Sequence, residues 1–532
     1  MEATLLHELA MIAATRDPDA LALTHGNRSI NYGTFAQSVA DVSASLRTLG
    51  LARGGRVAVY LDKRVEAVIA MFGAAAAGGV FVPLNPVLKP LQIQYVLRDC
   101  AAQVLVTSSD RLALLDEALR DCDDLLHVVI VDADTVPKSG HRYAMHRWED
   151  FRSASVSGHR VIDIDMAAIL YTSGSTGHPK GVVLSHRNLV AGAKSVASYL
   201  ENHSRDVLLA ALPLSFDAGF SQLTTAFHAG ASVALINYLV PRDVIDAVQR
   251  YRITGLTAVP PLWIQLAALK WPEGGPSTPQ HSLRYIANTG GRMPKATLDA
   301  LRALLPRTLV YLMYGLTESF RSTYLPPAEL DRRPDSIGKA IPNAEVLVVR
   351  EDGTLCDANE PGELVHRGAL VSLGYWNDPA KTGERFKPAP GQAAGLVMPE
   401  IAVWSGDTVR RDEEGFLYFI SRRDEMIKTS GYRVSPTEVE EVLYGTGLVG
   451  EVAALGIAHP VLGQAIVIVA TDRARGELDT QALLGACRER LPAFMVPARI
   501  IERKGGLPRN PNGKIDRKLL AQEFEGLFEA AA

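Results

Sequence analysis

Cysteine is scarce in this sequence, and the few cysteines that occur are widely separated. The 532 residues contain four, at Cys100, Cys122, Cys356 and Cys487. Their separations match neither a zinc-site spacing nor a disulfide framework. The sequence therefore gives no reason to expect a structural metal or an oxidising compartment, and we expect a reducing, cytoplasmic setting.

An excess of charge of one sign and a membrane-length apolar run are also lacking. The 55 basic and 59 acidic residues give a net charge of -4, so no nucleic-acid partner is expected. Met1 to Ala10 lacks the basic start and apolar core of a signal peptide, so we do not expect export. Ala67 to Leu84 holds no charged residue, but Gly78-Gly79 interrupts it. This pattern predicts a buried helix over 65–77 and a strand over 80–82 rather than a membrane span.

Short apolar strands alternate with helical stretches through most of the chain. Examples of the strands are Val57 to Leu61, Val104 to Thr107, Val128 to Val131 and Leu309 to Tyr314. This alternation predicts an α/β fold with largely buried sheets. A chain of 532 residues is too long for one hydrophobic core, so we expect about two to four folding units.

The last hundred or so residues have a pattern of their own. Ser435 to Tyr444 and Thr480 to Leu491 predict helices, and Val452 to Ile457 and Ala465 to Ala470 predict strands. These elements are enough for a small α+β domain. The charged segment Arg422 to Glu425 is a candidate connector in front of it.

One segment combines hydroxyls, glycines and a lysine in the way that a polyphosphate site requires. Tyr171 to Gly181 reads YTSGSTGHPKG, and predicted strands flank it at Met166 to Tyr171 and Gly181 to Leu184. Glycines let backbone N–H groups approach phosphate oxygens, and the lysine adds a charge. A Walker loop leads directly into a helix, whereas here the helix begins only after Ser185, a candidate N-cap. A polar surface turn is the alternative.

This segment resembles the phosphate loop of the AMP-forming adenylating enzymes, a superfamily that includes acyl-CoA synthetases, luciferases and the adenylation domains of nonribosomal peptide synthesis. The resemblance implies a large N-terminal domain over 1–423, made of stacked α/β sheets with a smaller barrel-like subdomain. A small mobile α+β lid domain would follow over 424–532. The loop residues implied to hold ATP are Thr172, Ser173, Gly174, Ser175, Thr176, Gly177 and Lys180.

Further motifs agree with the resemblance in their order along the chain. In Tyr314 to Glu318 (YGLTE), Tyr314 would face adenine, Thr317 would contact phosphate and Glu318 would bind Mg²⁺. Asp407 of the WSGD motif would accept hydrogen bonds from the ribose hydroxyls. The remaining residues implied for the nucleotide site and the hinge are Gly290, Gly315, Arg422 and, as the pivot, Asp424.

Lys514, in the run Asn510 to Asp516 (NPNGKID), matches the catalytic lysine of the family. The implied reaction has two steps. A carboxylate oxygen attacks the α-phosphorus of ATP, giving an acyl-AMP and pyrophosphate, and a thiol then takes the acyl group. Positioning and charge stabilisation dominate such phosphoryl chemistry, with Lys514, Thr317 and Glu318 as the catalytic set.

Asp217, in the run PLSFDAGF, is the main clue to the carboxylate substrate. In amino-acid-activating members the aspartate of this motif pairs with the substrate's ammonium group. A buried carboxylate is costly without a cation, so Asp217 favours an amino acid over a fatty acid. The alternative is that Asp217 caps the following helix.

Other pocket positions are carried over by their distance from the motifs. They are Ala218, Ser221, Ala258, Thr289, Met313, Arg321 and Ser322. Arg321 is unusual beside small residues. If it points inward it pairs with a second carboxylate or a polar substituent, and if outward it is a surface arginine.

The thiol acceptor is expected to arrive from another molecule, because no carrier-protein module follows Lys514. A separate carrier protein's phosphopantetheine arm is favoured over free CoA. A narrower likeness, over MYGLTESFRSTYLPP and RRPDSIGKAIPNAE, is to the exosortase-associated AMP-forming acyl-CoA ligases of bacteria. Two alternatives therefore remain: an acyl-CoA ligase for fatty or aryl acids, and a non-enzymatic member kept as a scaffold.

Overall fold

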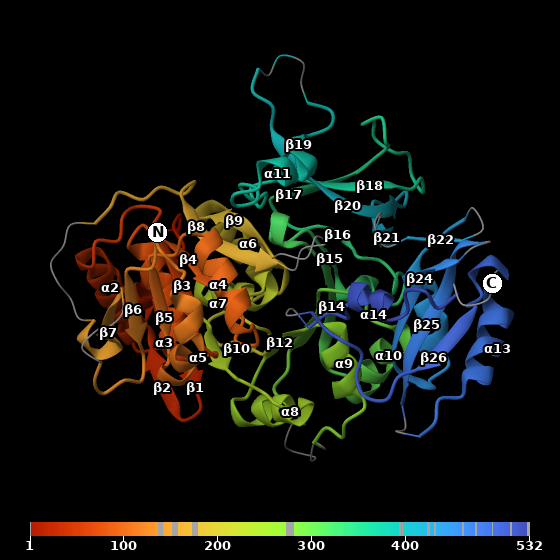
Figure 1. The fold of residues 1–532 in the computed structure, drawn as a ribbon, viewed down its shortest axis with the longest axis horizontal. Coiled ribbons are helices and arrows are strands. Elements are labelled where there is room, and N and C mark those ends of the chain that lie inside the picture. Colours follow the sequence, from red (N-terminus) through yellow and green to blue (C-terminus); the bar gives the residue numbers. More distant parts are fainter. Residues whose placement is uncertain are drawn as a thin grey trace.

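The computed structural model describes residues 2–136, 142–151, 158–172, 179–272, 281–392, 395, 397–422, 426–429, 432–459, 462–473, 476–491, 493–510 and 513–528. For residues 421, 422, 428, 432 and 433 it describes the backbone alone. Four sheets organise these residues, two of them large and largely parallel and two of them small and mainly antiparallel (Figure 1).

The larger of the two big sheets has the strand order β16-β15-β14-β13-β12-β10-β11-β1-β2. Its strands are β1 Leu21–His25, β2 Arg28–Asn31, β10 Val207–Ala210, β11 Ser232–Leu235, β12 Gly255–Ala258, β13 Tyr285–Asn288, β14 Leu309–Tyr314, β15 Thr323–Leu325 and β16 Lys339–Ala340. The central strands from β1 to β14 pair in parallel. Parallel strands present the loops after their carboxyl ends along one edge, where ligand sites of α/β sheets commonly lie.

The second big sheet has the order β7-β6-β5-β3-β4-β8-β9. Its strands are β3 Arg56–Tyr60, β4 Val80–Pro83, β5 Val104–Thr107, β6 His127–Ile130, β7 Ala144–Arg147, β8 Met166–Thr172 and β9 Lys180–Ser185. Only β8 and β9 run antiparallel, and the expected strand-loop-strand arrangement around the phosphate motif is confirmed. Helix α6 follows β9 directly, and its N-cap Ser185 accepts a hydrogen bond from the N–H of Asn188, as predicted.

Helices cover both large sheets, and some of them lie between the two. The helices of this part are α1 Glu8–Arg16, α2 Tyr32–Thr48, α3 Val65–Ala76, α4 Pro90–Asp99, α5 Ser109–Leu119, α6 His186–Tyr199, α7 Asp217–Ala229, α8 Pro241–Arg250, α9 Pro260–Ala267 and α10 Lys295–Leu304, with short 3₁₀ turns η1 Trp148–Asp150, η2 Thr317–Ser319 and η3 Pro327–Glu329. The predicted helix at 65–77 is α3, which is buried from Val65 to Ala75. Phe35, Phe72, Phe220 and Phe227 of α2, α3 and α7 meet Phe81 of β4 in one aromatic core.

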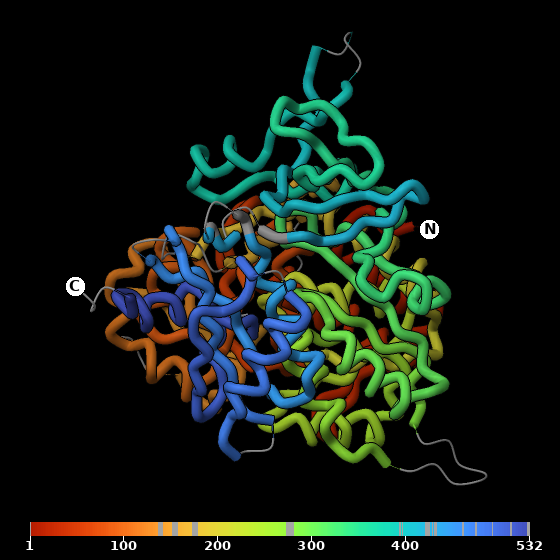
Figure 2. Tube along the Cα trace, turned by 90° about the vertical axis from the view of Figure 1, so that its right-hand side faces the viewer, coloured from red at the N-terminus to blue at the C-terminus, as the bar shows by residue number. Residues whose placement is uncertain are grey.

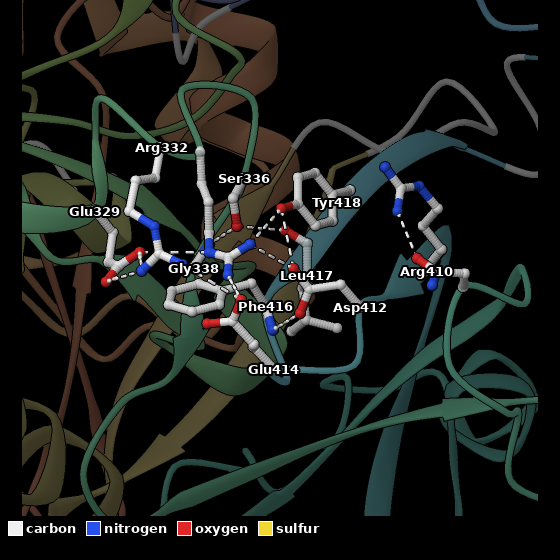
Figure 3. A network of polar contacts seen from close by, with 12 residues as sticks. Glu329, Arg332, Ser336, Gly338, Arg410, Asp412, Glu414, Phe416, Leu417 and Tyr418 are labelled. Carbon is white, nitrogen blue, oxygen red and sulfur yellow. Dashed lines mark hydrogen bonds and ion pairs between the residues drawn. The ribbon is translucent and has the colours of Figure 1, made fainter.

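A five-stranded antiparallel sheet forms the smaller subdomain at the top of Figure 1. It contains β17 Ala344–Val349, β18 Gly362–Gly368, β19 Phe386–Pro388, β20 Ile401–Arg411 and β21 Leu417–Arg422, with helix α11 Pro379–Arg385. A cluster of charged residues anchors it to the loop after η3 (Figure 3). Arg333 pairs with Asp412 at 2.9 Å and lies 4.3 Å from the Phe416 ring centroid, while Arg332 pairs with Glu329. This contact fixes the turn between β20 and β21, the two strands that carry Asp407 and Arg422.

The C-terminal part has its own sheet and core. It comprises β22 Ile427–Thr429, β23 Tyr432–Val434, β24 Val449–His459, β25 Gly463–Asp472, β26 Arg499–Glu502, helices α12 Pro436–Tyr444, α13 Thr480–Arg490 and α14 Arg517–Glu523, and the turn η4 Ala493–Met495. The predicted helices and strands of this region are confirmed, with ends that differ by a few residues. Both views show this part, in blue, against the large sheets (Figures 1 and 2).

Candidate active site

The phosphate loop begins and ends on the paired strands β8 and β9. Thr172 and Lys180 are direct partners in the pairing, and the Thr172 hydroxyl donates to the Lys180 carbonyl at 3.5 Å. Ser173, Gly174, Ser175, Thr176 and Gly177 lie outside the described residues. Because β8 and β9 are paired antiparallel strands, the two ends of the loop lie side by side, whereas a Walker loop leads from a strand into a helix.

Lys180 and Glu318 are brought together by a residue that the sequence did not indicate. The Lys180 Nζ atom lies 5.5 Å from the ring centroid of Tyr375, and the Tyr375 hydroxyl donates to Glu318 Oε1 at 2.6 Å. Burial, followed by the nearby Glu318 charge, raises the pKa of Tyr375, so its hydroxyl stays a donor. An isolated tyrosine in a loop carries no local signal, and only the fold reveals this contact.

The aromatic ring and the carboxylate expected at the nucleoside are in contact. The Tyr314 hydroxyl donates to Asp407 Oδ2, and Asp407 is buried on β20. A carboxylate accepts more than one hydrogen bond, so this contact suits a residue that also meets ribose hydroxyls. His366 stacks on Tyr314 with 6.1 Å between ring centroids, and burial lowers its pKa to about 3, so the ring is neutral. Arg422 is the backbone partner of Asp407 on β21.

Thr317 and Glu318 lie on η2, directly after β14. The turn continues through Phe320, a fully buried residue with φ of 54°, in the left-handed region that non-glycine residues avoid. The Arg321 N–H donates to the Ser319 carbonyl at 2.6 Å, which closes a tight three-residue turn. Strain of this kind costs about 1–3 kcal/mol and persists where the surrounding packing imposes it.

Lys514 reaches the large domain from a loop of the C-terminal part. The Lys514 N–H donates to Asn510 Oδ1 at 3.1 Å, and its carbonyl accepts from the Asn510 N–H at 2.8 Å. A Cβ atom added to Gly290, whose φ is +77°, would lie 3.5 Å from Lys514 Cε. The lysine therefore lies against the backbone of Gly290, beside the end of β13.

Asp217 is the first residue of α7, and Phe216 occupies the N-cap position. The carboxylate lies at the positive end of the helix and interacts with the Ala218 N–H, so a helix-end role stays the alternative to a substrate contact. Burial raises the pKa of Asp217, while the charges of Arg321 and Lys514 oppose that shift. A Cβ on Gly219 would lie 1.9 Å from the Pro213 carbonyl oxygen, so glycine is required for α7 to begin this close to the preceding turn.

Arg321 points inward. Its Nη1 lies 3.4 Å from Asp217 Oδ2, and each side chain is 4% exposed. A cavity of about 20 Å³ adjoins Arg321, and its walls come mainly from α6, α7, β10, β12, β13 and β14. The lining residues are Val196, Leu200, Leu208, Ala218, Ser221, Gln222, Thr225, Gly255, Thr257, Tyr285, Met313 and Arg321.

Four of the predicted pocket residues line this cavity, namely Ala218, Ser221, Met313 and Arg321. The predicted pocket residues that are buried but do not line it are Asp217, Ala258, Thr289 and Ser322. The walls from α6, β10 and β13 were not predicted, because no motif marks them and residues far apart in the chain create them. Gly255 leaves space for Tyr285 of the β13 wall, because a Cβ at Gly255 would lie 2.4 Å from the Tyr285 ring.

The donor set suits Mg²⁺ held jointly with phosphates. Among the described residues no group of three or more His, Cys, Asp or Glu side chains could hold a metal ion. Magnesium usually takes one or two carboxylates and completes its shell with substrate phosphates and water, and Glu318 beside the phosphate loop supplies such a carboxylate. In the part of the chain that the structure describes, no helix has the length and apolar character needed to cross a membrane.

Comparison with known proteins decides the family. The profile of the AMP-binding enzyme family matches residues 12–376, and that of the AMP-binding enzyme C-terminal domain matches 438–514. The chain belongs to the AMP-binding enzyme family. It is an AMP-forming acid–thiol ligase.

The similar proteins act on different acids. An L-proline--[L-prolyl-carrier protein] ligase of Streptomyces coelicolor is 32% identical over 525 residues, covering 93% of this chain and 92% of that protein. A long-chain-fatty-acid--CoA ligase of Escherichia coli O157:H7 is 30% identical over 517 residues, covering 91% and 88%. The crystal structure of the anthranilate CoA ligase AuaEII with anthranoyl-AMP superposes with a TM-score of 0.87 at 24% identity, covering 98% and 97%, and this likeness concerns the fold.

Proposed function

We propose that this enzyme activates a small carboxylic acid, in the first place an amino acid, as an acyl-AMP. ATP and Mg²⁺ are the co-reactants, and pyrophosphate is the first product. The acyl group then passes to the phosphopantetheine thiol of a separate carrier protein. The single observation that carries the proposal is the buried carboxylate of Asp217, which lies 3.4 Å from Arg321 of the cavity wall and interacts electrostatically with Lys514.

The proposed roles follow the geometry. Lys514 bridges the substrate carboxylate and the α-phosphate, and Thr317 donates to that phosphate. Lys180 and the loop before it hold the β- and γ-phosphates, with Glu318 as the protein ligand of Mg²⁺, which supplies charge neutralisation when bound. Tyr314, Asp407, Arg422, Gly290 and Gly315 hold the nucleoside.

In the first step, the substrate carboxylate oxygen forms a bond to the α-phosphorus while the bond from that phosphorus to the bridging oxygen breaks. Pyrophosphate carries away the electron pair. In the second step the thiol sulfur attacks the acyl carbon, AMP leaves, and the thiol proton goes to solvent. The protein contributes position and charge, with a preorganised ammonium at the developing negative charge.

We also propose the domain division at 423 and 424. The boundary and the pivot Asp424 fall outside the described residues, but the sheet of β22 to β26 forms a core separate from the others. Rotation about Asp424 would withdraw Lys514 from Gly290 and admit the thiol. The four buried, unpaired cysteines fit a cytoplasmic location.

A second candidate is an acyl-CoA ligase that uses free CoA. The observation in its favour is that Arg321 already offsets the charge of Asp217, so an ammonium group is not required for neutrality. The fatty-acid relative is consistent with it. The apolar side chains on the cavity wall, Val196, Leu200 and Leu208, suit an alkyl or aryl group.

Acid-dependent pyrophosphate release from ATP, measured over amino acids and simple carboxylic acids, tests the proposal. An amino acid should give the fastest release, and the product should then load a phosphopantetheinylated carrier faster than free CoA. Faster release with fatty acids than with every amino acid would overturn the amino-acid assignment. If none of the acids tested causes pyrophosphate release, the enzyme assignment is overturned.

A further inference from the structure

Arg321 is poorly satisfied for a buried arginine. A guanidinium has five N–H donors, yet among the described residues Asp217 is the single acceptor of its side chain, at 3.4 Å. The Nε atom is buried without a hydrogen-bond partner among those residues. Charge-assisted N–H···O contacts normally measure about 2.7–2.9 Å, so the contact to Asp217 is a loose one. The geometry leaves donors that a ligand acceptor would satisfy.

The backbone holds Arg321 in this position at a cost. The strained turn at Phe320 precedes it, and the Phe320 ring is locked against Gly192, where an added Cβ would lie 2.4 Å from the ring. On the other side, a Cβ on Gly315 would lie 3.2 Å from Arg321 Cα. Strained backbone conformations of this kind cluster at active sites and ligand sites.

Other unsatisfied polar atoms line the same cavity. Gln222 donates its amide N–H to the Leu209 carbonyl at 2.7 Å, and its buried Oε1 atom has no hydrogen-bond partner among the described residues. The hydroxyl of Thr225, one helical turn further on α7, is buried and has no partner in the described part of the chain either. Both residues line the cavity with Arg321. A long alkyl chain would leave all these groups unpaired, whereas a polar substituent pairs with them.

The charges around the cavity restrict the substituent further. Arg321 and Lys514 are cationic, and the carboxylates of Asp217 and Glu318 carry the opposing charge. An ammonium group on the substrate that pairs with Asp217 would compete with Arg321 for that carboxylate. A second carboxylate on the substrate would then accept two parallel hydrogen bonds from the guanidinium fork.

We infer that the acyl pocket is specific for a short α-amino dicarboxylic acid, whose ammonium group pairs with Asp217 and whose second carboxylate pairs with Arg321. Because Asp217 and Arg321 touch each other, the two substrate groups must lie on neighbouring carbons, as in aspartic acid. The inference rests on the proposed function and narrows its substrate class.

The test compares pyrophosphate release with aspartate, glutamate, alanine, succinate and octanoate. For the native chain we expect kcat/KM for aspartate to exceed that for each other acid by at least about tenfold. In Arg321→Met, the ratio of kcat/KM for aspartate to kcat/KM for alanine should fall about 30-fold or more. Arg321→Lys keeps the positive charge but lacks the planar guanidinium group. Its kcat/KM for aspartate should lie between the values of the native chain and of Arg321→Met.

Arg120→Gln is the matched control, because Arg120 forms an exposed ion pair with Asp116 far from the cavity. It should leave the ratio of aspartate to alanine unchanged, and the thermal unfolding midpoint of every variant shows that it folds. A native chain that prefers alanine, or an unchanged ratio in Arg321→Met, overturns the inference and leaves the amino-acid proposal standing. A preference for succinate or octanoate overturns both the inference and the amino-acid assignment. Preference for glutamate overturns the requirement for neighbouring carbons. If none of the five acids causes pyrophosphate release, both proposals are overturned together.

Discussion

Arg509 braces the loop that carries Lys514, and its removal should slow adenylation without blocking substrate binding. The guanidinium donates to the Gly513 carbonyl at 2.8 Å and pairs with Glu451 on β24. Glu451 also accepts from the Leu507 N–H at 2.7 Å, so one carboxylate binds the segment before Lys514 at both Leu507 and Arg509. Arg509 is a positioning residue, since it acts through the loop.

The magnitude follows from the bonds lost in Arg509→Ala. Hydrogen bonds to charged groups contribute about 1.5–3 kcal/mol each, and partial exposure of this pair reduces its contribution. If the displacement of Lys514 raises the activation free energy by about 1–2 kcal/mol, kcat falls roughly 5- to 30-fold. KM for the acid and for ATP should change by less than about threefold, because Arg509 touches neither.

The assay is pyrophosphate release at saturating ATP, with the unfolding midpoint measured on the same samples. Arg503→Ala is the matched control: Arg503 pairs with Glu523 in the same part of the chain but does not touch the Lys514 loop. Arg509→Lys should recover part of the rate. Equal rates in Arg509→Ala and Arg503→Ala would refute the bracing role, even if both variants were less stable than the native chain.

Three further predictions concern the site itself. Lys514→Ala should lower the adenylation rate by about 100-fold or more and leave ATP binding, measured by calorimetry, within about threefold; a near-normal rate would remove Lys514 from the mechanism. Asp217→Ala should reduce kcat/KM for amino acids more than for their des-amino analogues, and an equal loss for both would contradict the ammonium contact. Gly219→Ala should destabilise the chain by about 1–3 kcal/mol or more in urea unfolding, because its Cβ would clash with the Pro213 carbonyl; an unchanged midpoint would mean that α7 can shift.

The sequence predicted the elements where local pattern decides them. Strands such as Val104–Thr107 and Leu309–Tyr314 occur with the bounds predicted, since runs of apolar residues between polar turns leave little choice. The N-cap at Ser185 was also predictable from local sequence, because a capping hydroxyl bonds to a backbone N–H only three residues away.

The direction of Arg321 could not be predicted from the sequence. It depends on the left-handed conformation of Phe320, which no residue propensity favours and which packing against Gly192 imposes. The contact of Tyr375 with Glu318 likewise joins residues 57 positions apart. Such features arise from tertiary packing, which no local sequence pattern encodes.

The central claim is that this enzyme adenylates an amino acid held by Asp217, and a matched substrate pair tests it most directly. Pyrophosphate release is measured with the best amino acid and with the same acid lacking its amino group, under identical ATP and Mg²⁺. The account predicts a kcat/KM at least about tenfold higher for the amino acid. Equal or faster release with the des-amino acid would contradict it.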